Sequence, residues 1–174
     1  MRPRCILLAI PVLVVAAFGL TASTGPSRYR FPTRAVAETA EAFRDGFAGG
    51  QCKVFVGNVV AALTGIYPGG YQQGFARSGA VEILDPANAV RGDIVQITPR
   101  GSRDDTAESL YRLDDPTMRL HTMILRSARD PSGAFDVIDS NLGHDGLVHR
   151  HRMDPYQWAR GSIIRIWRYG VAFG

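Results

Sequence analysis

The sequence predicts an α+β domain in which N-terminal helices pack on a small antiparallel β-sheet. Apolar residues recur at helical spacing over residues 33–64. Short stretches rich in β-branched residues, separated by turn sequences, follow after residue 92. Helices that precede the strands, rather than alternate with them, are typical of the α+β class.

The first 23 residues predict a secretory signal peptide. Arg2 and Arg4 precede an apolar run over residues 5–20, and small residues follow at 21–23. We therefore expect a secreted, extracytoplasmic protein with no stable membrane span after processing. The alternative is an uncleaved membrane anchor, which the shortness of the run and Pro11 disfavour.

Residues 24–32 predict a linker, and residues 33–174 predict a single domain large enough to bury its own core. The chain carries 20 basic and 16 acidic residues, a formal net charge of +4. The basic residues form no long cluster that would follow a phosphate backbone, so nucleic acid is not an expected partner. We expect a monomer.

Two helices are predicted in the first part of the domain. The first follows Thr33, a good N-cap residue, and runs toward Gly46; its apolar face consists of Val36, Ala40, Phe43 and Phe47. The second covers residues 52–64 and is stopped by Gly65; its buried face consists of Val56, Val59 and Leu63. The valine content of the second segment also permits a strand.

Strands are predicted over residues 94–97, 121–125, 135–139 and 162–167. The turn sequence at residues 130–133 joins the second and third of these in an antiparallel hairpin. Residues 67–79 are rich in glycine and predict a surface loop. Residues 99–119 are polar and too numerous for a plain connection, which indicates a functional or partly disordered loop.

The candidate nucleophile is Cys52, at the start of the second predicted helix. The other cysteine, Cys5, lies in the predicted signal peptide, so Cys52 has no intramolecular disulfide partner in the domain. A thiol at a helix N-terminus lies beside the positive end of the helix dipole and unpaired N–H groups, which favour the thiolate. The same N–H groups can donate to an oxyanion, and the side chain of Gln51 offers a further amide donor.

The candidate base is His121, the first residue of the predicted hairpin. Asp139 and Asn141 lie at the far end of the second strand, and antiparallel pairing brings that end close to His121. Asp139 or Asn141 would accept a hydrogen bond from one ring nitrogen and leave the other for the thiol of Cys52.

These motifs resemble the CHAP family of cysteine amidohydrolases/peptidases, whose papain-like layout the NlpC/P60 family shares. The resemblance rests on residues 50–52, 92–95, 121–125 and 137–141 and extends roughly over residues 43–167. It implies a papain-like fold that hydrolyses an amide bond of peptidoglycan, acting as an N-acetylmuramoyl-L-alanine amidase or a peptide endopeptidase.

By position in the family pattern, Cys52 is the nucleophile and His121 the base. Asp139 stands where the family usually has glutamate, and Asn141 matches a frequent asparagine. The third role stays open between these two residues. The expected substrate is peptidoglycan or a cell-wall peptide, and no cofactor is expected.

Three other interpretations are open. The chain could be a catalytically inactive exported binding module of the same fold, with Cys52 a buried core thiol. It could also be a cysteine peptidase or transferase that acts on protein. His149 and His151 would share one face of a strand as a metal pair, but no further ligand lies at suitable spacing, so no metal is predicted.

Overall fold

The computed structural model describes residues 29, 31–70, 73–100 and 120–170. The predicted signal peptide and most of the polar segment 99–119 lie outside the described residues. The helices and strands are α1 (Arg34–Glu41), α2 (Cys52–Thr64), α3 (Gly74–Arg77), β1 (Val81–Glu82), a 3₁₀ helix (Pro86–Asn88), β2 (Ile94–Pro99), β3 (His121–Leu125), β4 (Phe135–Ser140), β5 (Val148–Met153), α5 (Pro155–Trp158) and β6 (Ser162–Arg168).

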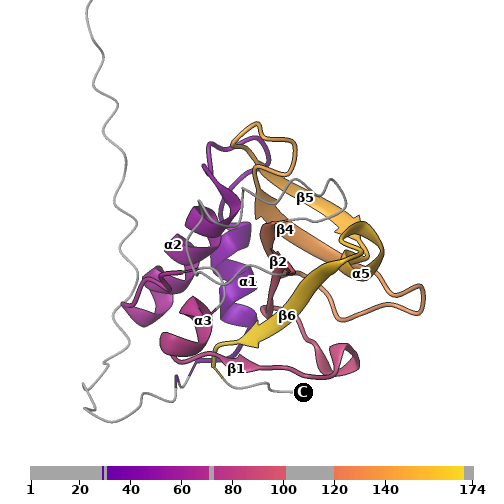
Figure 1. Ribbon diagram of the computed structural model, residues 1–174. Helices are drawn as coiled ribbons and strands as arrows, with labels where there is room; N and C mark the ends of the chain where they lie inside the picture. Colours follow the sequence, from indigo (N-terminus) through magenta and orange to yellow (C-terminus); the bar gives the residue numbers. More distant parts are fainter. Residues whose placement is uncertain (1–28, 30, 71–72, 101–119, 171–174) are drawn as a thin grey trace, which may run out of the picture.

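The strands form one six-stranded sheet in the order β1-β6-β2-β3-β4-β5, and all neighbours are antiparallel. Figure 1 shows α1, α2 and α3 gathered on one side of this sheet. The predicted α+β class, with N-terminal helices packed on an antiparallel sheet, is confirmed. Within the described ranges, no helix is long and apolar enough to cross a membrane.

Helix α1 begins where the sequence predicts but ends earlier. Thr33 occupies the N-cap position, although its side chain makes no capping hydrogen bond. The helix stops at Glu41, well before Gly46. Val36 is fully buried, whereas Phe47 is 50% exposed because the chain has already left the helix.

Helix α2 has the predicted bounds. It starts at Cys52 and ends at Thr64, and Gly65 follows in the left-handed conformation with φ 73°, which ends the helix. Val56 and Val59 on its inner face are buried in the core between the helices and the sheet. The helix packs against β3 and β4, so its first residue lies close to the hairpin.

The described residues of the predicted surface loop 67–79 are not all loop. They include helix α3, and Phe75 on this helix is fully buried against the sheet. The Nζ of Lys53 donates to the carbonyl oxygen of Pro68 and lies 4.0 Å from the centroid of the Phe75 ring. The high glycine content of the segment suggested a loop, but the segment contributes Phe75 to the core between the helices and the sheet.

The chain packs against the core before residue 33. Tyr29 and Phe31, within the predicted linker, pack against the core between the helices and the sheet. The ring of Tyr29 lies 5.5 Å from that of Tyr169, centroid to centroid. The packed part of the chain therefore includes the last residues of the segment predicted as a linker.

Strands β2, β3, β4 and β6 confirm the four predicted strands, and β3 has the predicted bounds. Strand β1 was not predicted, and residues 149–151 of β5 were considered as a strand only for a metal pair. Strand β5 has the sequence VHRHRM, in which alternating cationic and imidazole side chains replace the usual apolar pattern. It lies at an edge of the sheet, where such a strand tolerates polar residues.

The sheet separates two apolar cores. The first lies under α1 and α2 and includes Ile124 and Ile138. The second lies on the opposite face and includes Met123, Val137 and Trp158 of α5. Because side chains alternate along a strand, the odd-numbered residues of β3 and β4 point toward the second core.

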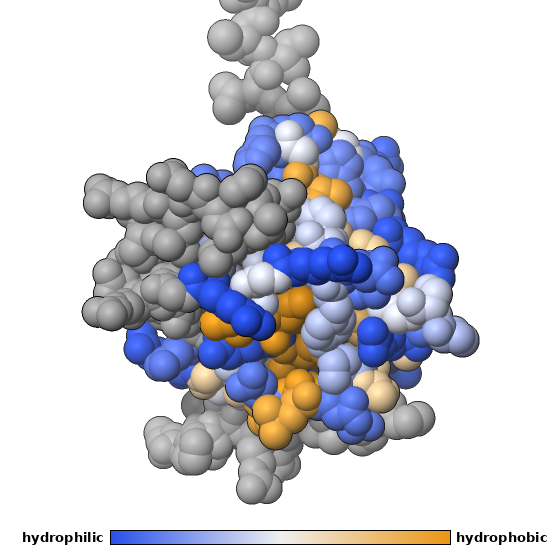
Figure 2. Space-filling view, turned by 45° about the vertical axis from the view of Figure 1, so that its right-hand side comes forward, coloured by the Kyte–Doolittle hydropathy of each residue, from blue (hydrophilic) through white to orange (hydrophobic). Residues whose placement is uncertain are grey.

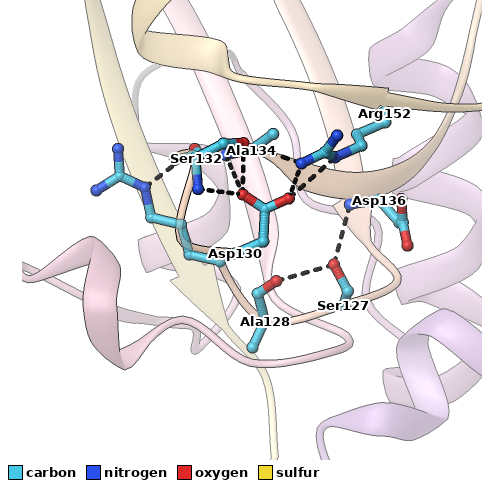
Figure 3. Close-up of polar contacts among 9 residues, drawn as sticks. Ser127, Ala128, Asp130, Ser132, Ala134, Asp136 and Arg152 are labelled. Carbon is cyan, nitrogen blue, oxygen red and sulfur yellow. Dashed lines mark hydrogen bonds and ion pairs between the residues drawn. The ribbon is translucent and has the colours of Figure 1, made fainter.

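The turn that closes the β3–β4 hairpin is fixed by one carboxylate (Figure 3). Asp130 Oδ1 accepts from the backbone N–H of Ser132 at 2.8 Å and of Ala134 at 3.1 Å. Arg152 of β5 donates to Oδ2 through Nε at 2.9 Å. Hydrogen bonds from Ser132 and Arg152 lower the pKa of Asp130, so the turn is held by an ionised group.

The surface is mostly hydrophilic, and Figure 2 shows hydrophobic residues gathered in a band on the face drawn there. Among the described residues, two large exposed apolar side chains, Val81 at 65% and Leu84 at 88%, lie in or beside β1. Strand β1 is the edge of the sheet opposite to β5. Val81 and Leu84 therefore lie at the opposite edge of the sheet from β5, the strand that carries His149 and His151.

Candidate active site

A loop over residues 46–50 fixes the start of α2 against the turn between β4 and β5. The backbone N–H groups of Gly49 and Gly50 both donate to the carbonyl oxygen of Gly146, at 2.9 and 3.0 Å. The hydroxyl of Ser140 donates to the carbonyl oxygen of Gly50 at 2.6 Å. These bonds hold the chain immediately before Cys52 to the end of β4.

Gly49 and Gly50 in this loop are required for different reasons. A Cβ on Gly49 would lie 2.5 Å from Ser140 Oγ and 2.7 Å from Val148 Cγ2, so no side chain fits there. Gly50 has open space around it but a φ of +70°, a conformation that residues with a side chain rarely adopt. Both conditions favour glycine just ahead of Cys52.

Cys52 is the first residue of α2 and is only 5% exposed. It is the one free cysteine that the described part of the chain contains. The first N–H groups of a helix have no carbonyl partner within it, so those at the start of α2 are candidate oxyanion donors beside the thiol. Gln51 precedes the helix in an extended conformation, and its side chain is exposed and makes no capping hydrogen bond.

His121 is 3% exposed, and its ring meets that of Trp158 edge-on at 5.7 Å between centroids. Its Nε2 donates to Asp139 Oδ2 at 2.7 Å. The side chain of Cys52 also interacts with this ring and raises the pKa of His121. Because Nε2 is used by the carboxylate, Nδ1 is the nitrogen left for the sulfur.

The strand register explains how His121 meets Asp139. Met123, two residues beyond His121, pairs directly with Asp139. His121 and Asp139 are therefore diagonal neighbours on the same face of the sheet, within reach of each other's side chains. The hairpin turn around Asp130 sets this register.

His121 and Asp139 each favour the charged form of the other. Burial alone lowers the pKa of His121, but hydrogen bonds to Asp139 and Cys52 outweigh burial and raise the pKa to about 9. Burial alone raises the pKa of Asp139, but hydrogen bonds from His121 and His151 outweigh it and lower the pKa. At neutral pH this environment favours a protonated imidazole between a carboxylate and a sulfur, the setting in which cysteine nucleophiles act.

His151 is the site residue that sequence reasoning missed. Its Nε2 donates to the same Asp139 Oδ2, at 2.9 Å. From the sequence it was a candidate only as a partner of His149 in a metal pair, and His149 instead bonds Asp145 at 2.7 Å. In the described ranges no cluster of His, Cys, Asp and Glu could hold a metal ion. The alternation of His149 and His151 was a usable signal, but only with β5 placed beside β4.

Asn141 has a local role in the structure. It adopts a left-handed conformation with φ 67°, and its Oδ1 accepts from the backbone N–H of Gly146 at 2.8 Å. Gly146 in turn accepts from Gly49 and Gly50. Asn141 thus shapes the turn that holds the loop before Cys52, while Asp139 is the residue that contacts the imidazole.

No family model and no curated protein matches this sequence. Among the solved structures that resemble the fold are two of Ly7917. The crystal structure of Ly7917 has a TM-score of 0.51 at 10% identity and is matched over 80% of this chain and 63% of that chain. The crystal structure of Ly7917 with the hydrolyzing product of MDP has a TM-score of 0.52 at 10% identity, over 79% and 63%. This chain therefore spans less than two thirds of the length of Ly7917, with which it shares the fold.

Proposed function

We propose that the protein is a cysteine hydrolase that cleaves an amide bond in peptidoglycan or in a peptidoglycan fragment. The series Cys52–His121–Asp139 carries this proposal: one buried imidazole bonds a carboxylate, and its pKa is raised by that carboxylate and by the side chain of Cys52. Burying charged groups costs free energy, so perturbed pKa values at a buried cluster are more typical of a functional site than of a core.

Two observations support the substrate class. Ly7917, which shares the fold, has been crystallised with the hydrolyzing product of MDP, a peptidoglycan fragment. The sequence motifs around Cys52 and His121 resemble those of the CHAP family. We accordingly infer membership of that family, action outside the cytoplasm, and cleavage either of the N-acetylmuramoyl-L-alanine amide or of a peptide bond.

The chemistry begins with the thiolate of Cys52 attacking the carbonyl carbon of the amide. Backbone N–H groups at the start of α2 donate to the oxygen that becomes negative, with the Gln51 amide as a further candidate donor. His121 gives its proton to the leaving amine, and an acyl-enzyme forms on the sulfur. His121 then accepts a proton from water, which attacks the acyl carbon and releases the acid and the thiolate.

Asp139 supports both steps without exchanging the proton itself. Its Oδ2 accepts from His121 Nε2, which fixes the ring orientation and leaves Nδ1 toward the thiol. It stays ionised because its pKa is lowered by His121 and His151 despite burial. Its negative charge stabilises the imidazolium form of His121, which then donates its proton to the leaving amine.

The first test measures wall hydrolysis by the purified protein and by Cys52→Ala. Wild-type protein should release new amines from peptidoglycan, and mass spectrometry of the products should identify the amine as that of L-alanine or of a residue within the peptide. Cys52→Ala should lose release entirely, because no other thiol stands in the site. Release at the wild-type rate by Cys52→Ala would falsify the nucleophile assignment.

A second measurement separates the alternatives. Labelling with iodoacetamide at mildly acidic pH, with the modified peptide located by mass spectrometry, should modify Cys52 in the wild type and more slowly in His121→Gln. His149→Gln is the matched control, since His149 bonds Asp145. A thiol of ordinary reactivity would instead indicate an inactive binding module. If the protein cleaves casein but leaves peptidoglycan uncleaved, it is a peptidase that acts on protein.

A further inference from the structure

We propose that His151 is a second positioning residue of the site: it holds the Asp139 carboxylate in the orientation that receives His121. This inference rests on the proposed function of Cys52 and His121. It goes beyond the three-residue series because it adds a residue that bonds the carboxylate of Asp139. His151 acts through Asp139 alone.

The first argument is the distribution of hydrogen bonds on the carboxylate. Oδ2 accepts from His121 at 2.7 Å and from His151 at 2.9 Å. Oδ1 is buried and has no hydrogen-bond partner among the described residues. The two imidazoles therefore supply the side-chain hydrogen bonds of a fully buried charge, and losing one leaves it with half of that support.

The second argument is geometric. A carboxylate that receives a single hydrogen bond can turn about its last side-chain torsion, because such terminal torsions are broad. Two donors converging on Oδ2 from different strands, β3 and β5, define where that oxygen lies. Asp139 itself sits on β4 between them, so His151 completes a layer of three side chains on one face of the sheet.

The third argument is the difference in exposure of the two imidazoles. The side chain of His121 is 4% exposed and that of His151 is 22% exposed. His151 thus lies on the solvent side of Asp139 and shields its charge. His151 bonds Asp139 on β4, and His121 on β3 bonds the same carboxylate. Along its own strand, His149 pairs with Asp145.

The test compares three variants of the full protein. His151→Leu removes the donor, whereas His151→Gln keeps an amide nitrogen at the position of Nε2. His149→Leu is the matched control: it removes a histidine from the same strand whose recorded partner is Asp145. Loss of a hydrogen bond to a charged group should lower kcat about tenfold or more in His151→Leu, with KM little changed. His151→Gln and the control should stay within about twofold of wild type.

A second readout does not depend on activity. In protein labelled with ¹³C at the aspartate carboxyl, the pKa of Asp139 should rise in His151→Leu, because a hydrogen bond that favours the anion is gone. His151→Gln should restore it. If His151→Leu does not fold, His151→Asn takes its place, since its shorter amide stops short of Oδ2.

These readouts distinguish the two levels of the argument. An unchanged kcat in His151→Leu, or a Gln variant as impaired as the Leu variant, overturns the positioning role. An unchanged Asp139 pKa overturns it as well. If the wild type hydrolyses no wall substrate, the proposed function fails, and the NMR titration still decides whether His151 holds Asp139.

Discussion

The two halves of the candidate site are held by different kinds of interaction. On the thiol side, the loop before Cys52 is fixed by backbone hydrogen bonds to Gly146 and by the absence of a side chain at Gly49. On the imidazole side, His121, Asp139 and His151 are fixed by side-chain hydrogen bonds between titratable groups. The first half therefore depends on shape and the second on charge, and substitutions should separate them.

The largest expected effect comes from removing the charge on the imidazole side. Asp139→Asn should lower kcat by about a thousandfold or more, because the neutral amide no longer stabilises the imidazolium and can hold His121 in the wrong tautomer. Steady-state kinetics on a wall substrate would measure it. Asp136→Asn is the matched control: Asp136 lies on the same strand but points outward and is exposed. Equal losses in the two variants would contradict a specific role for Asp139.

The pH dependence of stability should show the same division. The folded-state pKa of His121, about 9, lies above its ordinary value of 6.5. Protonated His121 therefore stabilises the fold fully below pH 6.5, and the contribution is lost as pH rises through 9. Its size is on the order of 3 kcal/mol.

Denaturant unfolding of the wild type and of His121→Gln between pH 6 and about 10 would measure this contribution. The free energy of unfolding should fall across the range in the wild type and fall less in the variant. Asp139 has the opposite pH dependence, because its pKa is lower in the folded state than its ordinary value. Ionised Asp139 stabilises the fold at pH values above that ordinary pKa, and this contribution is lost as pH falls through the folded-state pKa. Parallel pH curves for the two proteins would contradict the charge argument.

The parts of the site that could be predicted are those set by local signals. Gly65 marks the end of α2, so the helix that starts at Cys52 was predictable with its bounds. The turn at residues 130–133 predicts the hairpin, and the hairpin brings His121 to Asp139. Both inferences need only neighbours in sequence and one tight turn.

The parts that could not be predicted depend on pairing between distant segments. His151 reaches Asp139 only because β5 pairs with β4, opposite Val137, and the charged sequence of β5 does not resemble a strand. Phe75 is buried by α3 docking on the sheet, which its glycine-rich surroundings conceal. Asn141 was a candidate to orient His121, but its left-handed backbone turns it into the β4–β5 turn, where its side chain bonds Gly146.

On the thiol side, Gly49→Ala should destabilise the fold by about 1–3 kcal/mol, because the new methyl group would overlap with Ser140 and Val148. The activity of Gly49→Ala should also fall, because the start of α2 shifts. The pH dependence of its kcat/KM should keep the wild-type shape, because the groups that titrate are unchanged. Gly143→Ala is the control, since Gly143 has nothing within 4 Å of a Cβ and no left-handed conformation. A changed pH profile in Gly49→Ala would show that the two halves of the site are not separable.

The smallest effect concerns the bond that joins the two halves. Ser140, on β4 next to Asp139, donates to the carbonyl oxygen of Gly50 at 2.6 Å, so Ser140→Ala should cost about 1 kcal/mol of stability. Because Ser140 Oγ is also the atom nearest to a Cβ on Gly49, at 2.5 Å, the Gly49→Ala/Ser140→Ala double variant should be less destabilised than the sum of the single variants. Denaturant unfolding of the four proteins would give the coupling free energy. Strict additivity would mean that the loop before Cys52 relaxes away from β4. The position of the thiol would then be set by α2 alone, and not by the contact between this loop and the strand that carries Asp139.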